Sequence, residues 1–351
     1  MSKIPLPIIE QPAGSGGAVA PTTGSPSGGV DLRGSEPRGD ARRSGPARPS
    51  GAPDEAGGKP PWLKVRLKLT PEYTQVQRLV RESRLNTVCE SASCPNIVEC
   101  WGRRALTFMI LGNVCTRSCG FCDVMTGKPG AVDEDEPRRV AEALATLGLR
   151  YAVITSVDRD DLPDGGARIW AETIGQIKRA CPQMGLEVLT PDFKGVEADL
   201  LRVVGAGPDV FAHNIETVER LHMLVRPQAR YERTLGVIRA ASRAGAVTKS
   251  GMMLGLGEEL HEVILTMRDL RSAGCEILNL GQYLRPSARH LPIKRWVTPE
   301  EFAMLKEEGE RMGFVHVESG ALVRSSYRAD MQAEIMGLEH AWKLPVGGPI
   351  G

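Results

Sequence analysis

The fold is best predicted from the segment Leu106-Thr-Phe-Met-Ile-Leu111-Gly-Asn-Val-Cys115-Thr-Arg-Ser-Cys119-Gly-Phe-Cys122. Its apolar first part is typical of a buried strand, and the cysteines follow in the loop after it. Three thiolates at C-x3-C-x2-C spacing can bind one face of a 4Fe-4S cluster and leave one iron open to a small molecule. A zinc site usually has four protein ligands, and no fourth ligand stands at zinc-ribbon spacing here. The segment therefore predicts a strand followed by a cluster-binding loop.

The chain beyond this segment alternates between strand-like and helix-like stretches. Further strands are expected at residues 151–157, 186–189, 209–212, 247–254 and 276–280. Amphipathic stretches lie between the strands, at residues 137–147, 167–180, 196–204, 231–244 and 258–273. Strands that alternate with helices form βαβ units and a parallel sheet. We therefore predict an α/β fold, a partial (β/α)6 barrel of the TIM type.

Polar residues gather where the predicted strands end. Ligands of parallel α/β folds bind at the carboxyl ends of the strands, where the loops converge. Ser156 and Asp158 come at the end of the second strand, Asn214 and Glu216 follow the fourth, and Lys249 lies within the fifth. One such residue is usually a turn former, but several together favour a common site.

A second cysteine triplet, Cys89, Cys94 and Cys100, precedes the predicted barrel. Six of the eight cysteines in the chain fall between Cys89 and Cys122. Such crowding in a reducing compartment favours metal or cluster ligation over disulfide bridges. Three buried thiols or a zinc site are the alternatives for this triplet, but its position beside the other triplet favours a second cluster.

Composition limits the partners and the location. The 44 basic and 43 acidic side chains leave a formal charge of +1, so overall charge predicts no nucleic-acid or anionic-membrane partner. No apolar run has the length of a membrane helix, and the N-terminus lacks the apolar core of a secretory signal. We therefore expect a cytoplasmic protein without a membrane partner.

Residues 1–60 differ from the rest of the chain, with 12 Gly, 10 Pro and 7 Ser. Such a segment buries too little apolar surface to offset its ordering entropy, so we predict a disordered tail. A mitochondrial transit peptide is the less favoured alternative, because acidic residues accompany the arginines. We divide the rest into an N-terminal extension with the first cysteines (61–104), the barrel (105–313), and a C-terminal segment with a flexible end (314–351).

The C-x3-C-x2-C motif resembles that of the radical S-adenosylmethionine superfamily, including Phe121 before its last cysteine. Longer stretches resemble the lipoyl synthase family in particular, and this resemblance covers about residues 64–330. These stretches include Thr155-Ser-Val-Asp158, Glu187-Val-Leu-Thr-Pro-Asp192, His213-Asn-Ile-Glu216, Lys249-Ser-Gly251 and Arg324-Ser-Ser-Tyr327.

The resemblance implies an enzyme with two 4Fe-4S clusters. Cys115, Cys119 and Cys122 would hold the catalytic cluster, whose open iron chelates S-adenosylmethionine. Reductive cleavage of that cofactor would release a 5′-deoxyadenosyl radical. The side chains expected to contact the cofactor are Phe121, Ser156, Asp158, Asn214, Glu216 and Lys249.

The resemblance also implies an auxiliary cluster held by Cys89, Cys94, Cys100 and a serine of the Arg324-Ser-Ser-Tyr327 motif. Ser326 is the expected ligand, with Ser325 as the alternative. In the family this cluster donates two sulfur atoms to carbons 6 and 8 of an octanoyl chain on a carrier lysine, with two S-adenosylmethionine molecules used per lipoyl group. A serine oxygen is a hard ligand among soft thiolates, so its bond to iron should be the most easily released.

The partners implied by the resemblance are octanoylated lipoyl domains of 2-oxoacid dehydrogenase acyltransferase subunits, the glycine-cleavage H protein, a reductant such as ferredoxin or flavodoxin, and an iron–sulfur carrier that rebuilds the cluster. Two other functions are weighed against this one. A biotin synthase shares the C-x3-C-x2-C motif, but its pattern does not supply the first triplet and the Arg-Ser-Ser-Tyr element together. A zinc-binding interaction module without catalysis is the third hypothesis.

Overall fold

The computed structural model describes residues 54–63, 69–82, 85–92 and 94–338. Most of the predicted tail and residues 339–351 of the predicted flexible end lie outside the described ranges. Residues 54–60 of that tail are described, and Asp54 accepts hydrogen bonds there from the Arg285 side chain and the Ile293 backbone. Contacts with the barrel therefore begin before residue 60.

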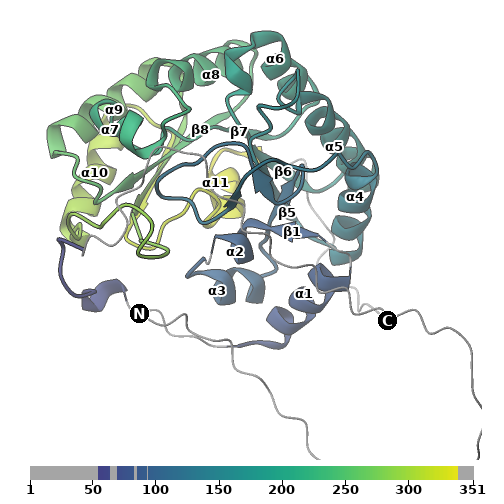
Figure 1. Cartoon of the computed structure of the whole chain (residues 1–351), viewed down its shortest axis with the longest axis horizontal. Helices are drawn as coiled ribbons and strands as arrows, with labels where there is room; N and C mark the ends of the chain where they lie inside the picture. The colour runs from purple at the N-terminus through teal and green to yellow at the C-terminus, as the bar shows by residue number, and fades with distance from the viewer. Residues whose placement is uncertain (1–53, 64–68, 83–84, 93, 339–351) are drawn as a thin grey trace, which may run out of the picture. The chain divides into compact units, whose positions relative to one another are not determined.

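A mostly parallel sheet forms the centre of the described structure (Figure 1). Its strand order is β1-β2-β5-β6-β7-β8-β9-β10, and neighbouring strands from β2 to β10 run parallel. The strands are β1 (Asn86–Thr87), β2 (Thr107–Ile110), β5 (Tyr151–Ser156), β6 (Gly185–Leu189), β7 (Val210–Ala212), β8 (Thr248–Leu254), β9 (Ile277–Gln282) and β10 (His316–Gly320). The predicted strands correspond to β2 and β5 to β9, so the partial barrel is confirmed.

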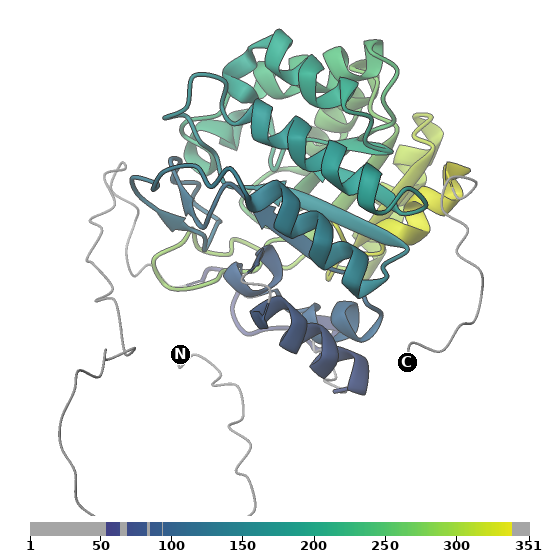
Figure 2. The ribbon, with the colours of Figure 1, turned by 90° about the vertical axis from the view of Figure 1, so that its right-hand side faces the viewer.

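Helices cover the outer face of the sheet (Figures 1 and 2). They are α4 (Glu136–Leu147), α5 (Ala167–Ala180), α6 (Glu197–Gly205), α8 (Tyr231–Arg243), α9 (Leu260–Ser272) and α10 (Pro299–Arg311). Each buries an apolar face, as the periodicity of the first five predicts. At the start of α10, the Thr298 hydroxyl accepts a hydrogen bond from Glu301 N at 3.2 Å, which satisfies a free donor of the first turn. The shorter η2 (Phe193–Gly195) and α7 (Glu219–Val225) lie between strands and helices of the barrel.

The C-terminal part extends the sheet and then enters the barrel. β10, which the sequence analysis did not predict, pairs with β9 from His316 to Gly320, so the expected boundary at residue 313 divides one continuous sheet. α11 (Ala329–Ile335) lies within the ring of outer helices (Figure 1). Its Ala329 and Ala333 pack against Tyr151 and Ile277, which begin their strands. The C-terminal segment therefore covers the amino ends of the strands.

The N-terminal extension lies beside the first barrel strand (Figure 2). It contains η1 (Pro61–Leu63), α1 (Pro71–Glu82), α2 (Val88–Ser91) and α3 (Ile97–Gly102). Trp101 of α3 is fully buried, with its ring 5.5 Å from that of Tyr73, and β1 pairs antiparallel with β2. The extension thus covers one edge of the sheet. Within the described part of the chain, no helix has the length and apolarity needed to cross a bilayer.

Candidate active site

The two cysteine triplets line two separate pockets. Cys89, Cys94 and Cys100 line a cavity of about 450 Å³, here called the first pocket. The C-x3-C-x2-C cysteines line a cavity of about 190 Å³, called the second pocket. Among the described residues, no lining residue is common to both, and all eight cysteines are free thiols. The two cysteine triplets therefore lie in different cavities.

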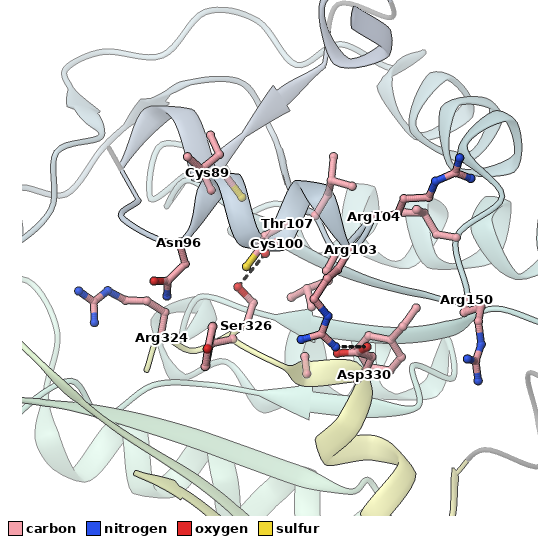
Figure 3. A pocket seen from close by; sticks show the side chains of 18 of the residues that line it. Cys89, Asn96, Cys100, Arg103, Arg104, Thr107, Arg150, Arg324, Ser326 and Asp330 are labelled. Carbon is pink, nitrogen blue, oxygen red and sulfur yellow. Dashed lines mark hydrogen bonds and ion pairs between the residues drawn. The ribbon is translucent and has the colours of Figure 1, made fainter. Parts of the chain in front are cut away.

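Two short helices and the C-terminal segment build the first pocket (Figure 3). Cys89 lies on α2, and Cys100 lies on α3. Ser326 lies beyond β10, more than 200 positions further along the sequence, and its Oγ accepts a hydrogen bond from Thr107 Oγ1 at 2.7 Å. The separation along the chain of these two bonded residues, 219 positions, shows that the pocket is completed by a distant segment.

Burial and a nearby arginine affect the thiols of the first pocket. Burial raises the pKa of Cys89 to about 11, and burial with repulsion from neighbouring cysteines raises that of Cys100 to about 12. Arg324 also lines this pocket, and its positive charge acts on Cys94. Soft thiolates, one hydroxyl and a cation fit an iron–sulfur cluster, and binding of iron would displace the thiol protons. The residues present therefore fit such a group.

A single metal ion fits these side chains less well. Among the described residues, no three His, Cys, Asp or Glu side chains converge closely enough to hold one ion. A cubane cluster instead takes its ligands on separate iron atoms, so the ligands stand further apart. Thiols on separate elements, such as Cys89 on α2 and Cys100 on α3, are compatible with such a cluster.

The loop of the second pocket is fixed by backbone contacts on both sides. Cys115 ends β3 (Val114–Cys115), which pairs with β4 (Met125–Thr126). The Cys115 Sγ accepts hydrogen bonds from Asp158 N at 3.3 Å and from Arg117 N at 3.4 Å. A β-carbon at Gly120 would lie 2.7 Å from Leu291 Cδ1, so a larger residue there would displace the Leu291 side chain.

Arg117 ties this loop to two neighbouring strand ends. Its side chain is 3% exposed and donates to Asp160 at 2.7 Å and to Asp192 at 2.6 Å, while Asp158 lies 3.2 Å away. Burial disfavours the charged forms of both Arg117 and Asp192. The hydrogen bonds and the attraction between their opposite charges outweigh this effect of burial. The pKa of Arg117 is therefore raised and that of Asp192 lowered. Sequence reasoning missed this role, although Arg117 stands inside the cysteine motif.

Phe121 of the cysteine loop and several strand ends supply more of the second pocket. Phe121, Ser156, Asp158, Asn214 and Glu216 all line it. The Ser156 Oγ and the Asn214 Oδ1 are buried and make no hydrogen bond to the protein. Glu216 has a φ of +67°, a conformation that costs energy outside glycine and that recurs at functional sites. Burial raises the pKa of the Glu216 carboxyl. Buried polar atoms without partners and local strain both indicate a ligand site.

Arg226 also lines the second pocket. Its Nη1 donates to the Asn214 carbonyl at 2.7 Å, and its Nε has no hydrogen-bond partner in the protein. For this arginine, which precedes a proline in a loop, the sequence left two interpretations open: solvated surface, or orientation of the acyl-lysine or its carrier. Neither interpretation placed it at the cofactor.

The expectation for Lys249 requires correction. Lys249 is not among the lining residues of the second pocket; it is the second residue of β8 and lies near the amino end of the strand. Its Nζ binds the Glu187 carboxylate at 2.9 and 3.0 Å, and the Tyr151 hydroxyl donates to the same carboxylate at 3.1 Å. Both charges are 1% exposed, so the pair neutralises charge inside the barrel. A side chain at the start of a strand lies far from the loops at its end.

The chain is similar to known proteins over most of its length. Residues 109–270 match the family model described as the Radical SAM superfamily. A lipoyl synthase of Rubrobacter xylanophilus is 57% identical over 279 residues, which cover 79% of this chain and 87% of that protein. The chain belongs to the lipoyl synthase family. A lipoyl synthase of Flavobacterium psychrophilum is 56% identical over 273 residues, or 78% of this chain and 94% of that protein.

Membership of the lipoyl synthase family makes the chain an enzyme of the radical S-adenosylmethionine superfamily, with the 4Fe-4S cluster and S-adenosylmethionine that this superfamily implies. The biotin synthase and zinc-module hypotheses are not supported. Among solved structures, one of methylornithine synthase is similar at 16% identity, with a TM-score of 0.47, over 77% of this chain and 93% of that protein.

Proposed function

We propose that this chain inserts two sulfur atoms at carbons 6 and 8 of a protein-bound N6-octanoyl-lysine and so forms a lipoyl group. The observation that carries the proposal is the separation of the two cysteine triplets into two pockets, one closed by Ser326. One pocket suits a permanent cofactor, and the other suits a cluster that is used as a substrate. The family resemblance supplies the chemistry that links them.

The second pocket is assigned to the catalytic cluster and S-adenosylmethionine. Cys115, Cys119 and Cys122 are the proposed cluster ligands, with Phe121 beside them, and Ser156, Asp158, Asn214 and Glu216 are the proposed contacts of the cofactor. When bound, cluster and cofactor supply a 5′-deoxyadenosyl radical that removes one hydrogen atom from carbon, so two cofactor molecules serve each lipoyl group. The Arg117 network holds the ligand loop in place during this chemistry.

The first pocket is assigned to the auxiliary 4Fe-4S cluster, the sulfur-donating substrate. Its proposed ligands are Cys89, Cys94, Cys100 and Ser326. Ser326 is preferred over Ser325, because Ser326 lines the pocket with the cysteines whereas the Ser325 hydroxyl binds Asn214. Its hard oxygen is the ligand expected to leave first when sulfur is withdrawn.

The protein partners follow from this reaction. We propose octanoylated lipoyl domains of 2-oxoacid dehydrogenases and the glycine-cleavage H protein as substrates. A ferredoxin or flavodoxin is proposed as the electron donor, and an iron–sulfur carrier as the source of a new auxiliary cluster. The proposed compartment is the cytoplasm.

The test is anaerobic reconstitution, followed by incubation with an octanoyl-lysyl peptide, a reductant and S-adenosylmethionine. We expect about eight iron and eight sulfide per chain, as two cubane clusters require. The peptide should gain two sulfur atoms and lose two hydrogens. A reconstituted protein that binds both clusters but leaves the peptide mass unchanged would contradict the proposal.

A further inference from the structure

The segment that carries Ser326 passes through the barrel interior and is held from several sides. Asn279 of β9 donates from its Nδ2 to the carbonyls of Arg324 at 3.0 Å and Ser325 at 2.9 Å. Asn96 donates to the Leu322 carbonyl at 2.7 Å. A β-carbon at Gly281 would collide with the Val323 carbonyl, so the strand leaves room for this segment. Its path is therefore fixed by the backbone as well as by side chains.

Two consecutive serines of this segment make contact with different pockets. Ser326 lines the first pocket and accepts a hydrogen bond from Thr107. Ser325 accepts a hydrogen bond from Asn214 Nδ2 at 2.5 Å, and Asn214 lines the second pocket. One peptide bond therefore separates the two contacts.

Asn214 is held in one orientation by this contact and one other. Its Nδ2 also donates to the Glu216 Oε1 at 3.0 Å, so both hydrogens of the amide nitrogen are used. If the Asn214 amide were turned over, its oxygen would face the Glu216 carboxylate oxygen. Two acceptor oxygens repel each other, so this orientation is disfavoured. At Gly251 a β-carbon would lie 2.9 Å from the Asn214 Oδ1 and 3.4 Å from the Ser325 Oγ. The absence of a side chain at Gly251 thus makes room for the Ser325–Asn214 contact.

We propose that Ser325 is a positioning residue for the S-adenosylmethionine site: its hydroxyl orients Asn214 and, through Asn214, the carboxylate of Glu216. This inference rests on the proposed function, which assigns Asn214 and Glu216 to the cofactor. It adds a physical link between the two pockets, because the segment that supplies a ligand to one also shapes the wall of the other.

The test measures S-adenosylmethionine binding to the reconstituted, unreduced protein by calorimetry, so that no turnover is needed. Ser325→Ala should raise the dissociation constant about fivefold, the factor that corresponds to the roughly 1 kcal/mol of one hydrogen bond. Iron and sulfide content should stay at the wild-type level. Ser325→Thr keeps the hydroxyl and should recover most of the affinity.

Ser319→Ala is the matched control. Its hydroxyl also donates a short hydrogen bond, to the Phe302 carbonyl at 2.7 Å, but Ser319 lines neither pocket. Its loss should leave the dissociation constant unchanged. In an Asn214→Ala background, Ser325→Ala should have no further effect, because the group that Ser325 orients is gone.

Wild-type affinity in Ser325→Ala, or an equal loss of affinity with and without Asn214, would overturn the inference. These outcomes are distinct from failure of the proposed function. If the wild-type protein forms lipoyl product while Ser325→Ala binds the cofactor normally, only the positioning role is lost. If the cofactor affinities behave as expected but no sulfur is inserted, only the proposed reaction is lost.

Discussion

The cysteines of the second pocket lie within one loop of eight residues, whereas the proposed ligands of the first pocket come from opposite ends of the described chain. The loop is bound to the barrel through the buried Arg117, with carboxylates from the β5 and β6 ends around it. At the rim of the first pocket, a half-exposed ion pair between Arg103 and Asp330 instead joins the N-terminal extension to the C-terminal segment (Figure 3).

This difference matches the proposed roles of the two pockets. A cofactor that survives every turnover needs a rigid, local site, and a buried charge network provides one. A cluster that is consumed and replaced needs a site from which a ligand can withdraw. The rim ion pair adds little to this site, because exposed ion pairs contribute about 1 kcal/mol or less. Since Asn279 and Asn96 hold the path of the Ser326 segment, release would take place at the bond between iron and the serine oxygen.

The largest effect is expected from the loss of a ligand of the second pocket. Cys119→Ala should reduce both 5′-deoxyadenosine and lipoyl product to background, because the cluster that cleaves the cofactor loses one of three thiolates. Chromatography of the nucleoside and mass spectrometry of the peptide measure the two products. 5′-Deoxyadenosine formed at a wild-type rate would show that these cysteines do not hold the catalytic cluster.

Cys94→Ala should affect only one of the two products. Lipoyl product should fall to background, while 5′-deoxyadenosine formation stays within about fivefold of wild type, the span of one lost hydrogen bond or weak contact. The same two assays apply, with iron content to confirm that one cluster remains. Lipoyl product from this variant would place the sulfur source elsewhere.

Ser326→Cys tests whether the serine oxygen is the ligand that is released from iron. A thiolate is softer than a serine oxygen and holds iron more firmly, so the first pocket should keep its cluster while sulfur transfer slows by about tenfold, or roughly 1.4 kcal/mol in the barrier. Iron and sulfide analysis reports the cluster, and single-turnover product formation reports the transfer. Full activity in this variant would count against the release argument.

Arg117→Met tests the rigidity of the second pocket. It removes the buried cation that three carboxylates share, although Asp192 keeps an ion pair with Arg233 at 3.1 Å. Unfolding of the cluster-free protein should therefore become easier by about 3–5 kcal/mol. Arg103→Ala at the rim of the first pocket is the matched control, with an expected loss of about 1 kcal/mol or less. Denaturant titration measures both, and equal losses would contradict the contrast in anchoring.

Acid should weaken the fold around the second pocket through His213, which lines it. Burial, with help from Arg226, lowers the pKa of His213 to about 4, from an ordinary value near 6.5. Between these values the unfolded chain binds a proton that the folded protein does not, so stability present above pH 6.5 is lost as the pH falls towards 4.

His213→Gln should reduce this loss by about 2 kcal/mol between pH 7 and pH 5, because each pH unit between the two pKa values contributes about 1.4 kcal/mol. Unfolding of the cluster-free protein at pH 7 and pH 5 measures the change. The control is wild type in the same buffers, since Asp192 and other carboxylates also respond to acid. An unchanged pH slope in the variant would remove His213 as the cause.

Much of the fold was predictable because apolar periodicity is a local property of the chain. The strands β2 and β5 to β9 and five of the outer helices carry clear patterns. β10 was missed because only Val317 of its five residues is buried, which leaves too weak a pattern to detect. The N-terminal β1 is only two residues long.

The site was predictable to the extent that its residues share a short motif. The cysteine spacing identifies the ligand candidates, and strand ends identify Ser156, Asn214 and Glu216. Contacts such as that of Thr107 with Ser326 join residues 219 positions apart and leave no trace in local spacing. Lys249 was misplaced because it was grouped with residues at strand ends, although it lies near the amino end of its strand. Its pairing with Glu187, 62 positions away, leaves no trace in local spacing.

The path of residues 321–328 through the barrel bears on how the protein is made. A ribosome releases the C-x3-C-x2-C loop and its barrel partners before the last strand has been translated, so the second pocket can take shape early. Ser326 emerges only after β10 has been translated. The first pocket therefore lacks its fourth proposed ligand until synthesis has passed residue 326, 219 positions beyond its partner Thr107.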